Sequence, residues 1–288
     1  MTAKFISIMC YILLAPFLGG LLEGLDRKIS ARMQGRVGPP ILQPFYDLVK
    51  LTKKQFIIVD RSQHFLLLSY MALMIFTGCM FFGGTDLLMC FFVLSTAAVF
   101  LYFAAVITSS PYTTIGGQRE LLQDMAYEPA LLLTAVGFYL VTGSFNVDTI
   151  IHTPYSLIAK LPGFFFAFVF ILTIKRRKSP FDESASHHAH QELVKGITTE
   201  MGGRNLALYN VTEWYETVLM LGVVALFIIN ENPWSYLAAV LVILLVYFFE
   251  ILVDNTCARV KTTTMVKMTW IVTLLSAGVN FLVLMLVH

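Results

Sequence analysis

The chain has 288 residues, of which 57% are hydrophobic and 13% are charged, and its mean hydropathy is +0.75. This composition excludes an ordinary soluble domain, in which about 25% of residues are charged. The net charge of +2 does not indicate a nucleic-acid partner, since the positions of the basic residues follow a membrane topology.

Apolar segments recur along the whole chain. A spanning helix needs about 20 mostly apolar residues, and eight segments qualify, the fourth and fifth less clearly. In chain order they are Phe5–Leu22, Phe65–Phe82, Leu87–Thr108, Pro129–Thr142 extended backwards through the polar stretch after Gly117, Tyr155–Ile174, Trp214–Ile229, Trp234–Val253 and Trp270–Val287. We predict an all-α polytopic membrane protein with about eight transmembrane helices, as a single transmembrane domain over residues 1–288. The first apolar run precedes its basic cluster, so we expect it to be retained rather than cleaved as a signal peptide.

The basic residues divide unevenly between the two sides of this topology. With eight spans, the odd-numbered loops are 23–64, 109–128, 175–204 and 254–267, and 18 of the 20 Lys and Arg residues lie there. The other side has only Lys4 and Lys160. Because cytoplasmic loops are enriched in Lys and Arg, we expect a multi-pass protein of the cytoplasmic membrane with both termini outside and the long loops cytoplasmic.

The first long loop contains an amphipathic segment after a Gly-Pro turn. Apolar residues recur there at helical spacing: Ile41, Leu42, Phe45, Leu48, Val49 and Leu51. The opposite side carries Asp47, Lys50, Lys53 and Lys54. This pattern predicts an amphipathic interfacial helix after the first span, lying under a partner or, alternatively, simply on the lipid surface.

The second long loop, Ser109–Glu128, is rich in charge. Arg119 is close enough in sequence to neutralise Glu120 or Asp124. A buried carboxylate near an Arg stays ionised, whereas one in apolar surroundings holds its proton, and stepwise proton transfer needs both kinds. The alternative is a solvated loop with ordinary ion pairs.

The segment from Lys175 to Glu216 is the most polar of the chain. It begins with four consecutive basic residues, Lys175–Lys178, which we interpret as a positive-inside orientation signal. It also contains six carboxylates: Asp182, Glu183, Glu192, Glu200, Glu213 and Glu216. Carboxylates at the edge of hydrocarbon are costly unless they face water or a partner, so they indicate an ion or proton path.

Two of these acids, Glu213 and Glu216, share one helical face at the start of an apolar span. A helix N-terminus stabilises negative charge, which gives a purely structural alternative for this pair. Glu250, late in the seventh span, is an isolated acid that could equally snorkel to the interface.

Metal ligands are not indicated. Of the three histidines, only His187 and His190 would share a helical face, and His188 would point elsewhere. We interpret them as contacts to a surface or partner, with a proton-relay or pH-sensing role as the alternative. An iron–sulfur cluster needs grouped thiolates, but the cysteines are far apart, at Cys10, Cys79, Cys90 and Cys257.

Three groups of residues stand in order on this scaffold. The first is Asp26-Arg27-Lys28, Ala31-Arg32-Met33-Gln34-Gly35-Arg36-Val37-Gly38-Pro39, Leu42-Gln43-Pro44, Asp47 and Lys50-Leu51. The second is Arg119, Gln123 and Tyr127-Glu128, and the third is Pro180-Phe181-Asp182, Glu192-Leu193-Val194, Gly196 and Glu200. Together they resemble, over nearly the whole chain, the membrane subunit shared by respiratory complex I (the NuoH type) and the membrane-bound, energy-converting NiFe hydrogenases.

Differences from the complex I pattern distinguish the complex I branch of this family from the hydrogenase branch. Complex I subunits have acids soon after the Pro-Phe-Asp and a shorter interval before the Glu-Leu-Val. Here the histidine-bearing stretch Ser184–Gln191 fills that interval, which is similar to membrane hydrogenases of the Ech type and the formate hydrogenlyase. Lys54-Gln55 also stands where complex I has Lys-Glu. These departures favour the hydrogenase branch over quinone binding.

The resemblance implies a non-catalytic membrane anchor and coupling subunit of a multisubunit NiFe hydrogenase. The expected partners are the peripheral large and small hydrogenase subunits, a ferredoxin-like subunit and an antiporter-like membrane subunit. The NiFe centre and the iron–sulfur clusters would lie in partner subunits, with no cofactor bound by this chain. Ferredoxin would donate electrons, and proton reduction would be coupled to translocation of H⁺ or Na⁺.

Within this scheme each group of polar residues has an expected role. The proton or ion path would use Asp124, Glu128, Asp182, Glu192, Glu200, Glu213 and Glu216. The interface with partner subunits would use Arg27, Arg32, Arg36, Arg119, His187, His188 and His190. Two alternatives are a quinone-site subunit of a complex I-like oxidoreductase and a stand-alone secondary transporter, which would purify without partners.

Overall fold

The computed structural model describes residues 2–55, 60–185 and 195–287, which form helices joined by turns, with no strand among them. The helices are α1 (Thr2–Met33), α2 (Gln43–Lys53), α3 (Arg61–Phe82), α4 (Leu87–Val106), α5 (Pro111–Thr142), α6 (Val147–Ile151), the 3-10 turn η1 (Leu157–Ala159), α7 (Pro162–Lys175), the 3-10 turn η2 (Gly196–Thr198), α8 (Gly203–Leu226), α9 (Trp234–Thr256), α10 (Thr262–Val272), the π-helical η3 (Thr273–Gly278) and α11 (Val279–Val287).

Local sequence sets several of the helix ends. The carboxylates of Asp60 and Asp86 accept hydrogen bonds from backbone N–H groups in the first turns of α3 and α4, as N-cap residues do. Pro111 stands in the first turn of α5, where its missing N–H costs nothing. Gly143 ends α5 in the left-handed conformation, with φ 72°.

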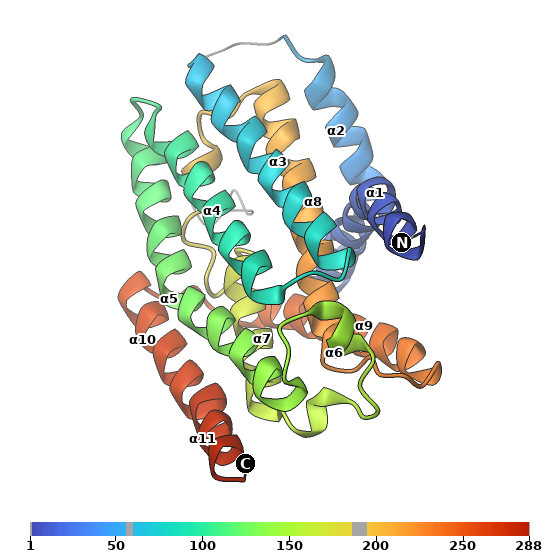
Figure 1. Ribbon diagram of the computed structural model, residues 1–288. Coiled ribbons are helices and arrows are strands. Elements are labelled where there is room, and N and C mark those ends of the chain that lie inside the picture. Colours follow the sequence, from blue (N-terminus) through green and yellow to red (C-terminus); the bar gives the residue numbers. More distant parts are fainter. Residues whose placement is uncertain (1, 56–59, 186–194, 288) are drawn as a thin grey trace.

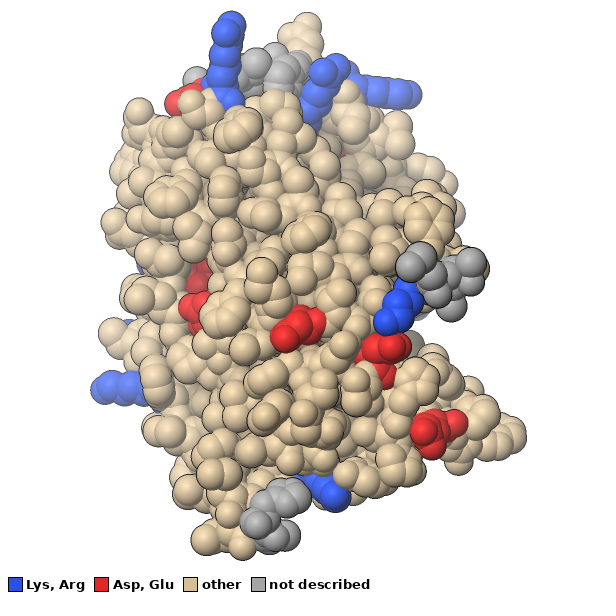
Figure 2. Space-filling model, viewed as in Figure 1, with Lys and Arg blue, Asp and Glu red and all other residues tan. Residues whose placement is uncertain are grey.

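The helices pack into one bundle. Figure 1 shows α3, α4, α5 and α8 side by side, with α10 and α11 along one edge and α1 at the other. Helix α7 lies against α5 and η3 inside this arrangement. Figure 2 shows a largely uncharged face, on which basic side chains project mainly at the upper edge. An uncharged surface of this kind suits contact with lipid.

Six segments of the described chain are helical, long and apolar enough to cross a membrane: α1, α3, α4, α5, α9 and the continuous α10–η3–α11. Helix α7, with 14 residues, is shorter, and α8, with 24 residues, contains charged side chains. The prediction of an all-α polytopic membrane protein is therefore confirmed. The number of eight spans and the sidedness of the loops stay predictions. The amphipathic helix predicted after the first span is confirmed as α2.

Two predicted boundaries are wrong because polar residues continue the helices. Helix α1 runs to Met33, beyond the predicted end at Leu22. Helix α8 begins at Gly203, before the predicted start at Trp214. The backward extension predicted for the fourth span is confirmed and reaches further than Gly117: helix α5 begins at Pro111, so most of the loop Ser109–Glu128 is helical and Pro129 lies inside the helix. Two of the polar side chains in these extensions, Glu120 and Glu213, pair with Arg177 inside the bundle, which a local sequence pattern does not record.

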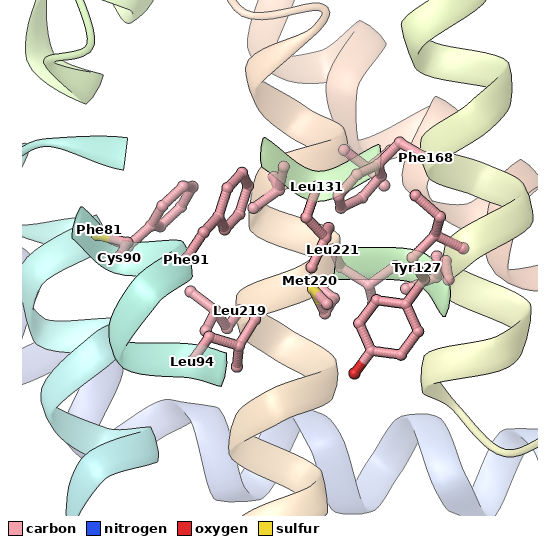
Figure 3. Packing of buried hydrophobic residues seen from close by; sticks show 14 of the residues in the cluster. Phe81, Cys90, Phe91, Leu94, Tyr127, Leu131, Phe168, Leu219, Met220 and Leu221 are labelled. Atoms are coloured by element: carbon pink, nitrogen blue, oxygen red, sulfur yellow. The ribbon is translucent and has the colours of Figure 1, made fainter. Parts of the chain in front are cut away.

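The core is built from aromatic and aliphatic side chains of α3, α4, α5, α7 and α8. Figure 3 shows Phe91 and Leu94 of α4 facing Leu219 of α8, and Tyr127 of α5 near Met220. The Tyr127 ring belongs to this cluster, while its hydroxyl is in the polar network at the end of α7. Cys90 is buried here, whereas Cys10 and Cys257 are exposed.

Candidate functional site

Four consecutive basic residues, Lys175 at the end of α7 and the three that follow it, lie against the interior of the bundle. Lys175, Arg177 and Lys178 are 5%, 2% and 6% exposed. Arg177 has a φ of 50°, an uncommon backbone conformation for a residue other than glycine. The interpretation of Lys175–Lys178 as an orientation signal therefore missed their structural role, because buried charges need partners. Those partners come from α1, α5, α8 and α9.

Arg177 joins α7 to α5 and α8. Its Nε lies 3.0 Å from each carboxylate oxygen of Glu120, and its Nη1 lies 2.8 Å from Oε1 of Glu213. The hydroxyl of Tyr209 donates to the same Glu213 oxygen at 2.6 Å. One guanidinium thus holds two carboxylates, with the multiple hydrogen bonds that make Arg–carboxylate pairs strong.

Lys175 forms a second cluster next to the first. Its Nζ lies 2.9 Å from Oε1 of Glu216 and 3.8 Å from Oδ1 of Asp124. It also donates to the hydroxyl of Tyr127 at 2.8 Å, and that hydroxyl donates to Asp124. On the far side, the Tyr70 hydroxyl donates to Oε2 of Glu216 at 3.3 Å. Carboxylates from two helices therefore meet at one ammonium group.

Arg176 and Lys178 face α1 and α9. Lys178 Nζ lies 2.5 Å from Oδ2 of Asp26 and 4.0 Å from Oδ2 of Asp254. Arg176 donates to the hydroxyl of Tyr247 at 3.3 Å. Burial, and then the neighbouring Arg176 guanidinium, lowers the pKa of Lys178, while the carboxylates of Asp26 and Asp254 oppose that shift.

The turn after these residues is tied to α5 and to the α9–α10 connection. Gln123 donates to the carbonyl of Phe181 at 2.6 Å, and Arg119 Nη1 donates to the carbonyl of Glu183 at 3.1 Å. Arg259 Nε lies 3.7 Å from Oδ1 of Asp182. Burial raises the pKa of the Glu183 carboxyl.

Two cavities meet at this network. A cavity of about 730 Å³ is lined by α1, the Gly38–Pro39 turn and all four basic residues, and Glu213 and Glu216 face it. A second, of about 330 Å³, lies between α4 and α5 and is lined by Asp124, Tyr127 and Glu128 among others. Within the described part of the chain, Lys175 is the residue common to both linings.

The structure brings together three of the predicted path residues, Asp124, Glu213 and Glu216. Glu128 is half-buried and lines the second cavity, one turn beyond Asp124. Asp182 pairs with Arg259 instead. Glu200 is half-buried and forms no ion pair with a described residue, and Glu192 lies outside the described residues.

Two positions assumed for these acids are wrong. Helix α8 begins at Gly203, about three turns before Glu213, so Glu213 and Glu216 are not at a helix N-terminus. Glu250 is fully buried, at 0% exposure, on the side of α9 that carries Tyr247, and does not snorkel.

Sequence reasoning missed several residues of this network as functional. They are Lys175, Arg177, Asp26, Glu120, Asp254, Tyr70, Tyr127 and Tyr209. The sequence did indicate that such a network exists, because residues of opposite charge on five apolar segments need partners in a membrane. The sequence did not show which of these charged residues pair with one another.

The predicted interface residues differ in their surroundings. Arg27 pairs with Glu23 and Asp47 of its own chain, at 2.5 and 2.8 Å, and Arg119 is half-buried against the Glu183 carbonyl. Arg32 and Arg36 are exposed at the end of α1. His187, His188 and His190 lie outside the described residues. Among the residues described, no cluster of His, Cys, Asp and Glu is arranged to hold a metal ion.

The chain is similar in sequence to several known proteins. Residues 6–285 match the model of the NADH dehydrogenase family. The chain is 29% identical to hydrogenase-4 component C of Escherichia coli (strain K12), covering 87% of each chain, and 28% identical to formate hydrogenlyase subunit 4 of the same organism, covering 87% of this chain and 89% of that one. It is 28% identical to the NuoH-type subunit of NADH-quinone oxidoreductase from Syntrophotalea carbinolica, covering 68% of this chain and 67% of that one.

The fold also matches a solved structure. A chain of the membrane-bound sulfane sulfur reductase, an archaeal respiratory membrane complex, superposes with a TM-score of 0.85 over 98% of this chain and 99% of that one, at 22% identity. The resemblance stated from the sequence is therefore confirmed. The chain belongs to the NADH dehydrogenase family and is a membrane subunit of a complex I-like complex, related to hydrogenase membrane subunits and to the NuoH-type subunit.

Proposed function

We propose that this protein is the membrane anchor and coupling subunit of a membrane-bound NiFe hydrogenase. It would link ferredoxin-dependent proton reduction in partner subunits to translocation of H⁺ or Na⁺ through buried carboxylates. The observation that carries the proposal is the ion network of Lys175 and Arg177 with Glu216, Asp124, Glu120 and Glu213, set between two cavities. Ionisable groups inside a membrane protein are costly, and they mark ion and proton pathways.

The network has the chemical parts that proton transfer needs. Carboxylates alternate with cations and with tyrosine hydroxyls over hydrogen-bond distances. At an effective dielectric constant near 20, a unit charge about 8 Å from a carboxylate changes its protonation free energy by roughly 2 kcal/mol. A redox event in an attached arm could therefore change which of these acids holds a proton.

The proposed attachment site is the exposed end of α1. Arg32 and Arg36 are exposed there. Arg36 lines the larger cavity together with the Gly38–Pro39 turn. The chain itself would bind no redox cofactor. The NiFe centre and the iron–sulfur clusters would lie in the hydrogenase large and small subunits and a ferredoxin-like subunit, with an antiporter-like subunit alongside in the membrane.

Co-purification tests this assignment. The N-terminus is tagged, the complex is extracted in mild detergent, and nickel, iron and hydrogen production from reduced ferredoxin are measured. We expect nickel together with ferredoxin-linked hydrogen evolution. A metal-free lone protein, after a control shows that the extraction does not strip partners, would contradict the proposal.

The carboxylate path is tested separately by Glu213→Gln. This substitution keeps the shape of the side chain and removes its proton-binding site. We expect hydrogen production with an artificial donor to be retained and ion transport in vesicles to fall. Glu200 lies outside the Arg177 network, in the connection between α7 and α8. Ion transport by Glu200→Gln shows whether the path extends to this connection. Unchanged transport in both variants would remove these acids from the path.

The size of the larger cavity favours a second candidate, a quinone-site subunit. About 730 Å³ is within the range of small-molecule sites. More than half of the residues that line it carry charge, however, which suits water better than a hydrophobic quinone. Quinone-analogue reduction by an iron-containing, nickel-free complex would favour this candidate instead.

A further inference from the structure

Lys175 occupies a position that no other described residue of the ion network shares. Its side chain is 4% exposed and lines both cavities, the larger one toward α1 and the smaller one between α4 and α5. Arg177, two residues later, lines the larger cavity. Lys175 is therefore the described residue that connects the linings of the two cavities.

The hydrogen bonds at Lys175 form a continuous chain across this position. Glu216 lies 2.9 Å from Nζ on the side of the larger cavity. Nζ donates to Tyr127 at 2.8 Å, and the Tyr127 hydroxyl donates to Asp124, which lines the smaller cavity. Both carboxylate side chains are largely buried, at 6% and 14% exposure.

The charges in this chain do not balance when every group is ionised. Glu216 and Asp124 contribute two negative charges against one ammonium, and an uncompensated buried charge is costly. The cluster is therefore suited to hold one additional proton. That proton can reside on either carboxylate, because the ammonium can pair with the other.

We propose that Lys175 is the proton-transfer link between the two cavities, an inference that rests on the proposed coupling function. Starting with a proton on Glu216, Lys175 donates one N–H proton to the oxygen of Tyr127. Tyr127 releases its own hydroxyl proton to Asp124, and neutral Lys175 then takes the proton from Glu216. The proton moves from Glu216 to Asp124, and both Lys175 and Tyr127 return to their initial states.

The neighbouring guanidinium has a different role in this scheme. Arginine does not deprotonate in proteins, so Arg177 is a fixed charge that holds Glu120 and Glu213 in place. A buried lysine, unlike an arginine, can give up and regain a proton. From the smaller cavity the proton continues toward Glu128, one turn along α5.

The test compares Lys175→Arg with Lys267→Arg, the same substitution at an exposed lysine of α10. Lys175→Arg keeps the positive charge and removes the ability to release a proton. In the reconstituted whole complex, we expect electron transfer with an artificial donor to be retained and ion transport per electron to fall about tenfold or more. Lys267→Arg should transport like the wild type. Normal transport by Lys175→Arg would show that Lys175 supplies only charge, which overturns the proposal.

A second variant keeps the test decisive if Lys175→Arg does not assemble. Tyr127→Phe keeps the ring in the core and removes the hydroxyl that joins Lys175 to Asp124. Ion transport by Tyr127→Phe should fall as it does for Lys175→Arg. Normal transport by Tyr127→Phe would contradict the proposed proton transfer between Lys175 and Asp124. Glu216→Gln and Asp124→Asn separate the two failures. If Glu216→Gln and Asp124→Asn abolish ion transport while Tyr127→Phe does not, the carboxylate path is supported and the proposed role of Lys175 is contradicted. If none of these variants changes transport, the proposed coupling path is contradicted as well.

Discussion

At the residue scale, the network depends on paired buried charges. Arg177 pairs with both Glu120 and Glu213, and all three side chains lie inside the bundle or at its inner cavity. Pairing such groups contributes little net stability, but removing one partner leaves a buried charge without compensation. Substitutions at this position therefore affect stability more than surface substitutions do.

Arg177→Met tests this dependence. We expect it to destabilise the protein by about 3–5 kcal/mol, because two carboxylates lose their cation in a low-dielectric site. The midpoint of thermal unfolding in detergent measures the loss, with exposed Arg32→Met as the control. Adding Glu120→Gln to Arg177→Met should recover part of the stability. A double variant no better than the single one would contradict the charge argument.

Glu183 predicts a pH dependence at a site outside the helices. Burial raises the pKa of its carboxyl in the folded state. The folded protein therefore binds more protons than the unfolded chain, and the stability from protonated Glu183 is lost as pH rises from about 4.3 through the raised pKa. Glu183→Gln should remove this loss, so the variant should gain thermal stability relative to wild type at neutral pH but not at pH 4. Exposed Glu231→Gln is the control, and an equal difference at both pH values would contradict the assignment.

At the element scale, close backbone contacts hold α2 and its preceding turn against α1. A Cβ atom at Gly24 would lie 1.8 Å from the carbonyl oxygen of Ile41. Glycine at this position lets the Gly38–Ile41 turn approach α1 and form part of the wall of the larger cavity. The position of α2, and hence the shape of the proposed arm-binding surface, depends on this contact.

Gly24→Ala should displace that turn, because the added methyl group would meet backbone atoms that cannot rotate away. We expect lower stability and weaker retention of peripheral subunits during purification. Gly202→Ala is a matched control, since a Cβ there meets nothing within 4 Å. Equal retention of the arm by both variants would show that the turn does not position the partner surface.

At the scale of the whole molecule, polar and apolar surfaces are arranged for a membrane. Large hydrophobic side chains are exposed along α9 and α11, such as Leu245 at 66% and Leu286 at 86%. Lys175 and Arg177 are buried in the interior together with their carboxylate partners. Figure 2 shows one face that is largely uncharged, with a few acidic side chains in its middle and basic side chains mainly at its edges. A bundle with so many exposed apolar side chains needs lipid around its outside.

Arg36→Glu tests the proposed partner surface. Arg36 is exposed beside the larger cavity, so reversing its charge should weaken the attachment of the peripheral arm without unfolding the bundle. Extraction in mild detergent followed by gel filtration measures the fraction of complex that keeps the arm. Lys267→Glu, at an exposed residue of α10, is the control. An arm that stays bound and active at raised salt would count against a contact at Arg36.

The sequence by itself determined the fold class, most of the helical segments and the amphipathic helix α2. These follow from apolar run length and 3.6-residue periodicity, which are local properties of the chain. The three ordered motifs also led to the family. Asp124, Glu213 and Glu216 were identifiable as candidates, because carboxylates inside apolar segments are costly wherever they pack.

Only the tertiary structure decided which charges meet. Lys178 reaches Asp26 across 152 residues of sequence, and Arg177 reaches Glu120 across 57. Whether a basic run is a surface signal or a buried network depends on which helices pack around it, and no local pattern records that packing. The helix boundaries failed for the same reason, since a polar residue continues a buried helix when a distant partner compensates its charge.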